Sequence, residues 1–436
     1  MATTERPAIA GGAPTVPAGA HRRWPDIREE DREAVLRALD SGVVCGANAP
    51  EITALQREWA EYLGVEYCLA LNTGTAALHC ACAAVGLGPG DEVIVPAYTF
   101  VATAMAVVHQ GATPVFSDVD PRTYTIDPAR IEERIGERTR AIMPVHLHGL
   151  PADMDDIRAI AERHGLAVIE DAAQSHGATY RGRKTGTLAD CAGFSLNATK
   201  NLSGGEGGLF VTNDPDHFIA ARRLSVFGED VNPTSLGEFR RYWTRGVGWN
   251  YRNQELSSAL ARSQLRRLDA YNEVAQENAR VLSEGLERLP GILPPHVPED
   301  RTSIWHKYRL RFDASALGWT GDVVELRDRL VRALRAEGVE AVLWQVVPLP
   351  AYPAFRRELR PWRPRDEGEE LRPWDPAEYP AASELLDCSL ILGSETQPLF
   401  VQKPELMRQY VQAFEKVLAN LEAIAALPFE PVPLVD

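Results

Sequence analysis

Short apolar runs recur through the first half of the chain and alternate with longer segments of helical periodicity. The runs are four to seven residues long and apolar on both faces, as expected for strands of a parallel sheet that is covered by helices. They are Tyr67–Leu71, Glu92–Pro96, Thr113–Val119, Ala141–His146, Ala167–Glu170, Cys191–Ser195 and Gly208–Thr212. The alternation predicts an α/β domain built on a mostly parallel, seven-stranded sheet with helices on its faces.

Helical periodicity fills the segments around these runs. Two short amphipathic helices are expected before the first strand, over Asp31–Leu39 and Glu51–Leu63. From Gln254 to Leu289, apolar residues keep close to a period of about 3.6 residues, which predicts one long helix. Pro290 and Gly291 would end this helix. A helix of that length would lead from one domain towards the next.

The last part of the chain mixes both kinds of element. Strands are expected at Tyr308–Phe312 and Ala341–Val347, and helices at Asp322–Glu337 and Glu405–Ala425. The segment Arg356–Pro380 has no periodicity and is dense in Pro, Trp, Arg and Glu, so we expect an irregular excursion whose aromatic residues cover other parts. This pattern predicts a smaller α+β domain at the C-terminal end.

The length of the chain supports more than one domain. It has 436 residues, whereas single hydrophobic cores stop growing at roughly 250–300 residues. We expect a flexible N-terminal arm over residues 1–24, a large α/β domain over 25–285 and a small C-terminal domain over 286–436.

Composition narrows the range of partners. The net charge of −15, from 46 basic and 61 acidic residues, argues against a nucleic-acid-binding protein. The N-terminus lacks the apolar region of a signal peptide, and no apolar run approaches about 18 residues, so we expect a soluble, cytoplasmic protein without a membrane partner. The six cysteines are scattered without a CxxC pair, which favours reduced, buried thiols.

Two motifs at the ends of predicted strands can each be explained by structure or by chemistry. In NTGTAALH (72–79), a glycine and a threonine precede an alanine-rich helix whose first amides could hold a phosphate; a structural helix cap explains it as well. In VIEDAAQ (168–174), Asp171 ends a buried strand, where a carboxylate is costly unless it faces a cation such as a protonated pyridine nitrogen. It could equally cap the next segment.

A third motif places Lys200 just after a strand and before four glycines in the loop 204–208. A lysine in a desolvated pocket has a lowered pKa and forms imines readily, and glycines let a backbone pass close to a bound ring. Taken in order, a phosphate cradle, an aspartate and a lysine at successive strand ends are what a pyridoxal 5′-phosphate (PLP) site requires.

At these residues the chain resembles the DegT/DnrJ/EryC1/StrS family of sugar aminotransferases, within the PLP enzymes of fold type I. The likeness runs from about Trp24 to Val347. It rests on eight segments that occur in the family's order: Gly46 with the following Leu55–Gly64 helix, NTGTAALH, VIVPAYTFVATAMAV, GATPVFSDVD, MPVHLHG, IEDAAQSHGA, FSLNATKNLSGGEGG and GWNYRNQELSSALARSQL.

The resemblance implies roles around the cofactor ring. Lys200 would carry PLP as a Schiff base and later move a proton between substrate and cofactor. Asp171 would pair with the pyridine nitrogen and keep the ring an electron sink. Gln174 would hydrogen-bond the phenolic oxygen, and Phe100 would stack on the ring face, although core packing is the usual role of an aromatic side chain.

It also implies how the phosphate is held. Gly74, Thr75 and Ser195 would bind it from one subunit, although a strand-end serine often bonds only to backbone. Asn250 would reach the phosphate from a partner subunit, so the catalytic unit would be a homodimer. Arg252, close to Asn250 in the sequence, is a weaker candidate for the substrate site.

Two histidines are further candidates for contact with the substrate, His148 and His176. His146 and His148 alternate at an expected strand end and would share one face, which suits a metal pair. No third ligand is evident, so we expect no metal site. The family commonly has an aromatic residue at the second position, so His148 departs from the pattern.

The function implied is transfer of an amino group from L-glutamate or L-glutamine to a keto-sugar or keto-cyclitol in the biosynthesis of amino sugars or aminoglycosides. A dehydrating, aromatising enzyme of the aminohydroxybenzoate synthase type remains an alternative. Sugar dehydratases of the family carry histidine in place of the lysine, and a regulatory relative would be expected to lack Lys200 or Asp171. The sequence retains both residues. Residues 374–380, WDPAEYP, resemble inosose aminotransferases of aminoglycoside pathways.

Overall fold

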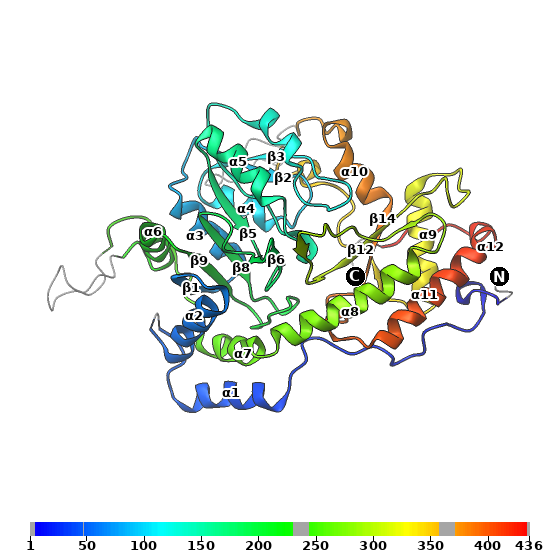
Figure 1. The fold of residues 1–436 in the computed structure, drawn as a ribbon, viewed down its shortest axis with the longest axis horizontal. Helices are drawn as coiled ribbons and strands as arrows, with labels where there is room; N and C mark the ends of the chain where they lie inside the picture. Colours follow the sequence, from blue (N-terminus) through cyan, green and yellow to red (C-terminus); the bar gives the residue numbers. More distant parts are fainter. Residues whose placement is uncertain (1–4, 47, 230–243, 357–370, 434–436) are drawn as a thin grey trace.

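The computed structural model describes residues 5–46, 48–229, 244–356 and 371–433. Its elements form a large unit around a seven-stranded sheet and a smaller unit around a four-stranded sheet. Helix α8 (Leu268–Leu286) runs from the large unit along the smaller one (Figure 1). The two-unit α/β architecture predicted from the sequence is confirmed.

The large sheet has the strand order β1-β9-β8-β5-β4-β2-β3. Only β9 runs antiparallel to its neighbours β1 and β8, and the other pairings in this sheet are parallel. The strands are β1 (Tyr67–Leu71), β2 (Glu92–Pro96), β3 (Thr113–Ser117), β4 (Thr139–Ile142), β5 (Ala167–Asp171), β8 (Cys191–Ser195) and β9 (Gly208–Thr212). The carboxyl ends of β1, β5 and β8 therefore meet at one edge of the sheet, and all seven predicted strands are found.

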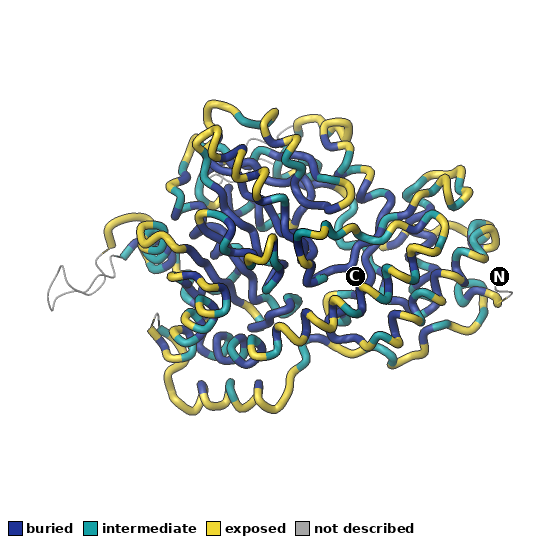
Figure 2. The backbone as a smooth tube through the Cα atoms, viewed as in Figure 1, coloured by how far each residue is buried: buried dark blue, intermediate teal, exposed yellow. Residues whose placement is uncertain are grey.

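Helices cover both faces of this sheet because successive strand residues point to opposite sides. Leu69 and Leu71 pack in one core with α3 and α4, whereas Cys68 and Ala70 pack in another with α2. Figure 2 shows the strands as the most buried part of the molecule. The helices of the large unit are α1 (Glu29–Asp40), α2 (Pro50–Leu63), α3 (Gly74–Ala84), α4 (Ala102–His109), α5 (Met154–His164), α6 (Pro215–Ser225) and α7 (Glu255–Leu265).

The smaller unit packs helices against the sheet β10-β12-β14-β13. Its core joins strand residues such as Tyr308 and Leu390 to Leu330 of α9 and Phe414 of α11. Its elements are β10 (Ile292–Leu293), β12 (Tyr308–Phe312), α9 (Val323–Ala336), β13 (Ala341–Val342), α10 (Pro380–Asp387), β14 (Ser389–Leu392), α11 (Pro404–Ala419) and α12 (Leu421–Ala425). A separate small sheet has the order β11-β6-β7, with β6 (Thr179–Tyr180), β7 (Arg183–Lys184) and β11 (Arg301–Thr302).

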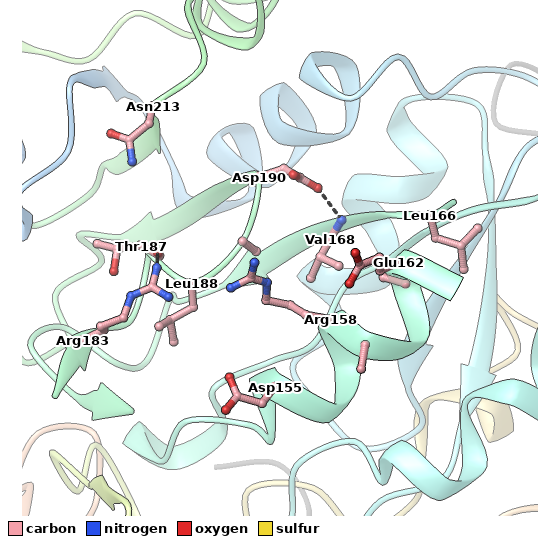
Figure 3. Close-up of a pocket in the computed structure, with 13 residues that line it drawn as sticks. Asp155, Arg158, Glu162, Leu166, Val168, Arg183, Thr187, Leu188, Asp190 and Asn213 are labelled. Carbon is pink, nitrogen blue, oxygen red and sulfur yellow. Dashed lines mark hydrogen bonds between the residues drawn. The ribbon is translucent and has the colours of Figure 1, made fainter. Parts of the chain in front are cut away.

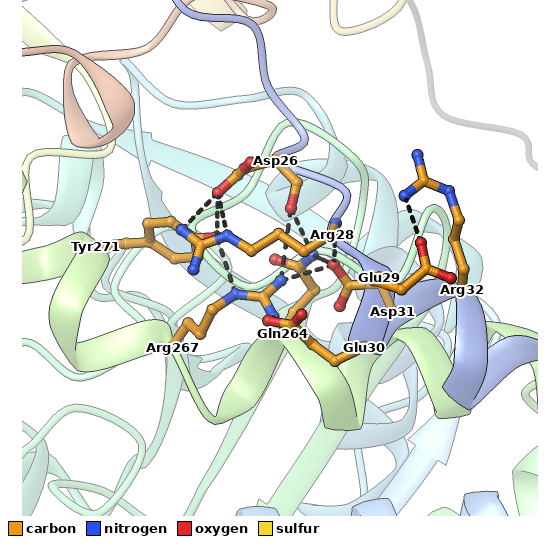
Figure 4. A network of polar contacts seen from close by, with 9 residues as sticks. All are labelled: Asp26, Arg28, Glu29, Glu30, Asp31, Arg32, Gln264, Arg267 and Tyr271. Carbon is orange, nitrogen blue, oxygen red and sulfur yellow. Dashed lines mark hydrogen bonds and ion pairs between the residues drawn. The ribbon is translucent and has the colours of Figure 1, made fainter.

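The prediction of one helix from Gln254 to Leu289 is wrong, because the segment forms α7 and α8 with a break at Arg267. The break contains neither proline nor glycine, so the sequence gives no sign of it. Figure 4 shows the Arg267 guanidinium at this break, where it pairs with Asp31 (2.7 Å) and Glu30 (2.7 Å) of α1. The break thus lies where α7 and α8 contact α1, a contact that the apolar stripe does not reveal.

Two other expected elements differ from the prediction. The strand expected over Ala341–Val347 is only β13, because the chain then turns towards the large unit, where Gln345 Nε2 donates to Thr99 O (2.7 Å). The helix expected over Glu405–Ala425 is divided at Asn420 into α11 and α12.

The segment expected to be a flexible arm lies against the smaller unit over residues 5–24. Ala8 N donates to Glu337 Oε1 (2.7 Å), and Val16 is buried in the core of the smaller unit. Trp24 packs edge-on against Tyr271 and Phe400. We propose domain boundaries of 1–24, 25–285 and 286–436, with the first segment as a strap rather than a free arm.

Part of the irregular segment Arg356–Pro380, including Trp362, lies outside the described residues. Within its described end, Trp374 stacks on Tyr379 with 5.9 Å between ring centroids, and Tyr379 is buried in the core of the large unit. None of the helices in the described ranges is long and apolar enough to cross a membrane.

Candidate active site

A cavity of about 410 Å³ lies at the carboxyl ends of β1, β5 and β8. The smaller unit closes it with His306, Lys307, Trp344 and Glu395. Seven of the eleven site residues predicted from the sequence line it: Gly74, Thr75, Phe100, Asp171, Gln174, Ser195 and Lys200. The three strand-end motifs therefore meet around one space.

The first turn of α3 forms one end of this cavity. Thr73 caps the helix by accepting from the Ala76 amide (3.0 Å), and the first intrahelical bond is donated by Ala77 to Thr73 O. The amides of Gly74 and Thr75 come before that bond, at the positive end of the helix dipole. A Cβ on Gly74 would lie 2.7 Å from Ser195 Cβ, so glycine is required for β8 and α3 to come this close. The result is a compact anion cradle.

Asp171 ends β5 and faces the cavity from its floor, only 4% exposed. Its Oδ2 accepts from Thr103 Oγ1 (2.7 Å), and its Oδ1 accepts from the Ala173 amide (3.1 Å). Burial raises the pKa of Asp171, although these two donors and the Lys200 ammonium oppose the rise. Such a carboxylate is stabilised by a cation placed in the cavity.

Lys200 lies in the loop after β8 and points into the same cavity. Ala198 N donates to Gly205 O (2.8 Å) and Trp24 Nε1 donates to Ala198 O (2.6 Å), so the glycine loop and the N-terminal strap hold this segment. Burial lowers the pKa of Lys200 to about 8, against the opposing effect of Asp171 and Glu395. With this pKa, about one tenth of the amine is neutral and nucleophilic at pH 7.

Gln174 and Phe100 complete the walls. Gln174 Oε1 accepts from the His148 amide (2.9 Å), which leaves its Nε2 group to donate into the cavity. Phe100 is 49% exposed, which is unusual for an aromatic side chain beside a core. It lies nearly parallel to Trp344, with 6.2 Å between ring centroids. Both rings offer flat apolar surface to a ligand.

Four predicted residues do not line the cavity. His176 is fully buried between Trp59 and Phe194, and burial lowers its pKa to about 3. Asn250 is exposed and pairs with Val226 through a backbone bridge, whereas Arg252 lies over Phe227 (5.3 Å). Asn250 therefore lies outside the cavity of its own chain, so that its expected contact with the phosphate would have to be made in the cavity of a partner subunit.

The fourth is His148, and the expectation that it shares a face with His146 is wrong. Strand β4 ends at Ile142, and His148 lies in a 3-10 turn with φ of 58°. His146 Nε2 contacts Glu170 Oε2 (2.9 Å), whereas His148 Nε2 contacts Tyr98 Oη (2.9 Å). Within the part of the chain that the structure describes, no group of side chains suits a metal ion.

Sequence reasoning missed the residues that reach the cavity from the smaller unit. Lys307, Trp344 and Glu395 are far from the motifs along the chain and lie in no glycine-rich or strand-end pattern. Thr103, which donates a hydrogen bond to Asp171, lies in the first turn of α4. From the sequence it is indistinguishable from an ordinary core threonine. The only feature of the sequence that could have singled out Lys307 is its position directly before the expected strand Tyr308–Phe312.

A larger hollow of about 630 Å³ lies elsewhere, beside α5 and β5 (Figure 3). Two of its carboxylates have local partners: Asp155 pairs with Arg181, and Asp190 accepts from the Val168 amide (2.8 Å). Of the three strand-end motifs only Val168 reaches this hollow, and neither Asp171 nor Lys200 lines it. Size alone therefore does not identify the reactive site.

The chain matches known proteins over most of its length. Residues 25–363 match the model of the DegT/DnrJ/EryC1/StrS aminotransferase family. The GDP-perosamine synthase of Caulobacter vibrioides is 40% identical over 318 residues, covering 73% of this chain and 82% of that protein. A protein of Micromonospora echinospora with the provisional name L-glutamine:3-amino-2,3-dideoxy-scyllo-inosose aminotransferase is 36% identical over 342 residues, covering 77% and 79%.

Solved structures give the same result. DesV of S. venezuelae, solved with a ketimine intermediate, aligns with a TM-score of 0.76 at 33% identity and covers 91% of this chain and 98% of DesV. A provisionally named sugar aminotransferase of Streptococcus pneumoniae, solved in its PLP form, aligns with a TM-score of 0.77 at 25% identity over 92% of this chain and 98% of that one. The chain therefore belongs to the DegT/DnrJ/EryC1/StrS aminotransferase family and is a PLP-dependent aminotransferase.

Proposed function

We propose that this enzyme moves an amino group from L-glutamate or L-glutamine to the ketone of a cyclitol or sugar. The observation that supports this most is the partly neutral amine of Lys200 in one cavity with the buried carboxylate of Asp171 and an anion cradle. A PLP aminotransferase requires these three groups from its protein.

The residues of the cavity fit PLP. The amides of Gly74 and Thr75 and the hydroxyl of Ser195 suit its phosphate dianion, because helix N-termini bind such groups well. Asp171, already oriented by Thr103, suits the protonated pyridine nitrogen. The free amide of Gln174 suits the phenolic oxygen, and Phe100 suits the ring face. The cavity thus offers a chemically complementary residue to the phosphate, the pyridine nitrogen, the phenolic oxygen and the ring face of PLP.

Lys200 is assigned both covalent attachment and proton transfer. When bound, PLP supplies the electron sink that lets an amino group leave one carbon skeleton and join another. The Lys200 amine, with a pKa of about 8, is suited to move a proton from the α-carbon of the donor to the cofactor carbon in the first half-reaction and from the cofactor carbon to the acceptor carbon in the second. Asp171 stays ionised opposite the cation that it binds. Trp344 and Lys307 line the cavity on the side of the smaller unit.

The charge of the cavity favours a free cyclitol or sugar over a nucleotide-linked one. Among the described residues that line it, the acids Asp171, Glu206 and Glu395 outnumber the cations Lys200 and Lys307. A diphosphate is poorly matched to this balance, whereas carboxylates accept hydrogen bonds from sugar hydroxyls. The inosose in the name of the Micromonospora echinospora relative likewise carries no phosphate.

Each half-reaction gives a direct test. Purified holoenzyme is expected to lose its yellow absorbance with L-glutamine or L-glutamate, and the resulting pyridoxamine form to regain it with scyllo-inosose. Titrations with a nucleotide-linked keto-sugar serve as the comparison. Absorbance that persists with every amino donor would reject the aminotransferase assignment, and an aromatic product would indicate the dehydrating alternative.

We also propose a homodimer with shared active sites, in which Asn250 of each chain reaches the phosphate bound by the other. Its exposure, away from its own cavity, supports this arrangement. Mixing Lys200→Ala chains with Asn250→Ala chains should restore about one quarter of wild-type activity at limiting PLP, because half of randomly formed dimers contain one intact site. Each variant refolded alone is the control. Absence of any restoration would contradict the shared site.

A further inference from the structure

Lys307 places a second ammonium group in the reaction cavity. It precedes β12, is 8% exposed and lines the same space as Lys200 and Asp171. Its backbone amide donates to His148 O (3.4 Å), which fixes the segment against the turn beneath the cavity. A nearly buried lysine needs a compensating anion.

The acid beside it is a loose partner. Glu395 Oε1 lies 3.8 Å from Lys307 Nζ, whereas a charge-assisted hydrogen bond is roughly 2.7–2.9 Å long. The Glu395 side chain is 55% exposed, so water can solvate it without Lys307. Exchange of this carboxylate for another one at Lys307 therefore leaves no buried charge unpaired.

Aromatic rings place Lys307 next to the part of a substrate that extends beyond the cofactor. Phe100, the proposed ring-stacking residue, lies nearly parallel to Trp344, and Lys307 Nζ lies 5.2 Å from the centre of the Trp344 ring. The hydrogen bond from Gln345 to Thr99 O holds the Trp344 segment on the loop that carries Phe100. Along the cavity wall, Phe100 is thus followed by Trp344 and then by Lys307.

Of the charged groups that act on Lys307, Glu395 is negative, and Lys200 and Arg309 are positive. Arg309, two residues further, is 1% exposed, and its Nε and Nη2 have no hydrogen-bond partner among the described residues. Burial, together with the charges of Lys200 and Arg309, lowers the pKa of Lys307 to about 8, with Glu395 opposing. An added carboxylate relieves this repulsion between positive groups.

We propose that Lys307 binds the α-carboxylate of the amino donor, displacing Glu395, and that Glu395 returns to Lys307 when the keto-sugar or keto-cyclitol occupies the cavity. This inference rests on the proposed function. One cavity must accept an anionic amino acid and a neutral polyol in turn, and an exchangeable Lys307–Glu395 pair provides both charge states without a change of fold.

The test separates donor from acceptor binding. Lys307→Met is expected to raise the KM for L-glutamine and L-glutamate in the first half-reaction by about tenfold to a hundredfold, the usual effect of losing a hydrogen bond to a charged group. The KM for scyllo-inosose in the second half-reaction should change little. Lys307→Arg should recover part of the donor affinity, and Glu395→Gln should lower the donor KM because the competing carboxylate is gone.

A binding measurement gives a readout independent of turnover. Calorimetric titration of the holoenzyme with glutarate, a dicarboxylate without an amino group, should show affinity that Lys307→Met loses and Lys307→Arg retains in part. The same titration with GDP and dTDP serves as the comparison. The inference is overturned if Lys307→Met keeps the wild-type donor KM and glutarate affinity, or if it loses affinity only for GDP or dTDP. If none of the amino donors removes the yellow absorbance of the wild-type enzyme, the proposed function fails instead.

Discussion

Replacing Lys200 with alanine is expected to lower the rate of amino-group transfer by roughly 10²–10⁴-fold or more, the range for removing a positioned acid–base group. The variant loses both the covalent hold on PLP and the amine that moves the proton. Lys200→Arg should be equally inactive, because guanidinium has no neutral form near neutral pH. Initial rates and the yellow absorbance of the purified proteins measure both effects.

Lys184 offers a matched control. Its Nζ lies 3.5 Å from the centre of the Tyr62 ring and donates to Tyr62 O, and it does not line the cavity. Lys184→Ala should therefore keep both the rate and the colour. A small primary amine added to Lys200→Ala should recover some transfer by supplying the missing base. Wild-type turnover by Lys200→Ala without added amine would exclude Lys200 as the reactive residue.

The sequence located the large unit and its strand-end motifs well because both depend on local patterns. A run such as Tyr67–Leu71 is apolar on both faces only if helices cover the sheet, and Asp171 at a strand end must face a polar space. The break at Arg267 is different, because only its ion pairs with α1 reveal it. The positive φ of His148, which separates it from His146, also has no local sequence signal.

The part of the site that sequence reasoning missed comes from the smaller unit. Lys307, Trp344 and Glu395 reach the cavity only because β12, β13 and β14 are paired in one sheet whose loops face the large unit. Such convergence depends on packing between distant segments. The proposed cofactor-binding residues were therefore predictable from motifs, whereas the residues proposed to select the substrates were not.

The adjacent carboxylates Glu170 and Asp171 are expected to separate stability from activity. Neighbouring residues of a strand point to opposite faces, and Glu170 is fully buried on the face away from the cavity. It accepts from the amides of Gly186 (2.7 Å), Leu188 (2.7 Å) and Ala189 (3.0 Å) and pairs with His146 (2.9 Å). Glu170 thus holds the loop between β5 and β8 in place.

Glu170→Gln should lower the apparent Tm by roughly 5–10 °C, because breaking a buried charged network costs about 3–5 kcal/mol and an amide nitrogen cannot accept these hydrogen bonds. The folded fraction should keep a near-normal kcat. Asp171→Asn should do the opposite. Asparagine can accept from Ala173 N through its Oδ1 and donate to Thr103 Oγ1 through its Nδ2, and it removes a carboxylate whose pKa is raised by burial, so the apoprotein should be as stable as wild type or more so.

Activity of Asp171→Asn should nevertheless fall by at least about 10²-fold, because a neutral amide does not stabilise a protonated pyridine nitrogen. The gain in Tm on adding PLP should shrink as well. Thermal melts with and without PLP, beside single-turnover rates with L-glutamine, measure each effect. If Asp171→Asn destabilises the apoprotein while Glu170→Gln abolishes turnover of the folded enzyme, the two carboxylates have been assigned to the wrong faces of β5.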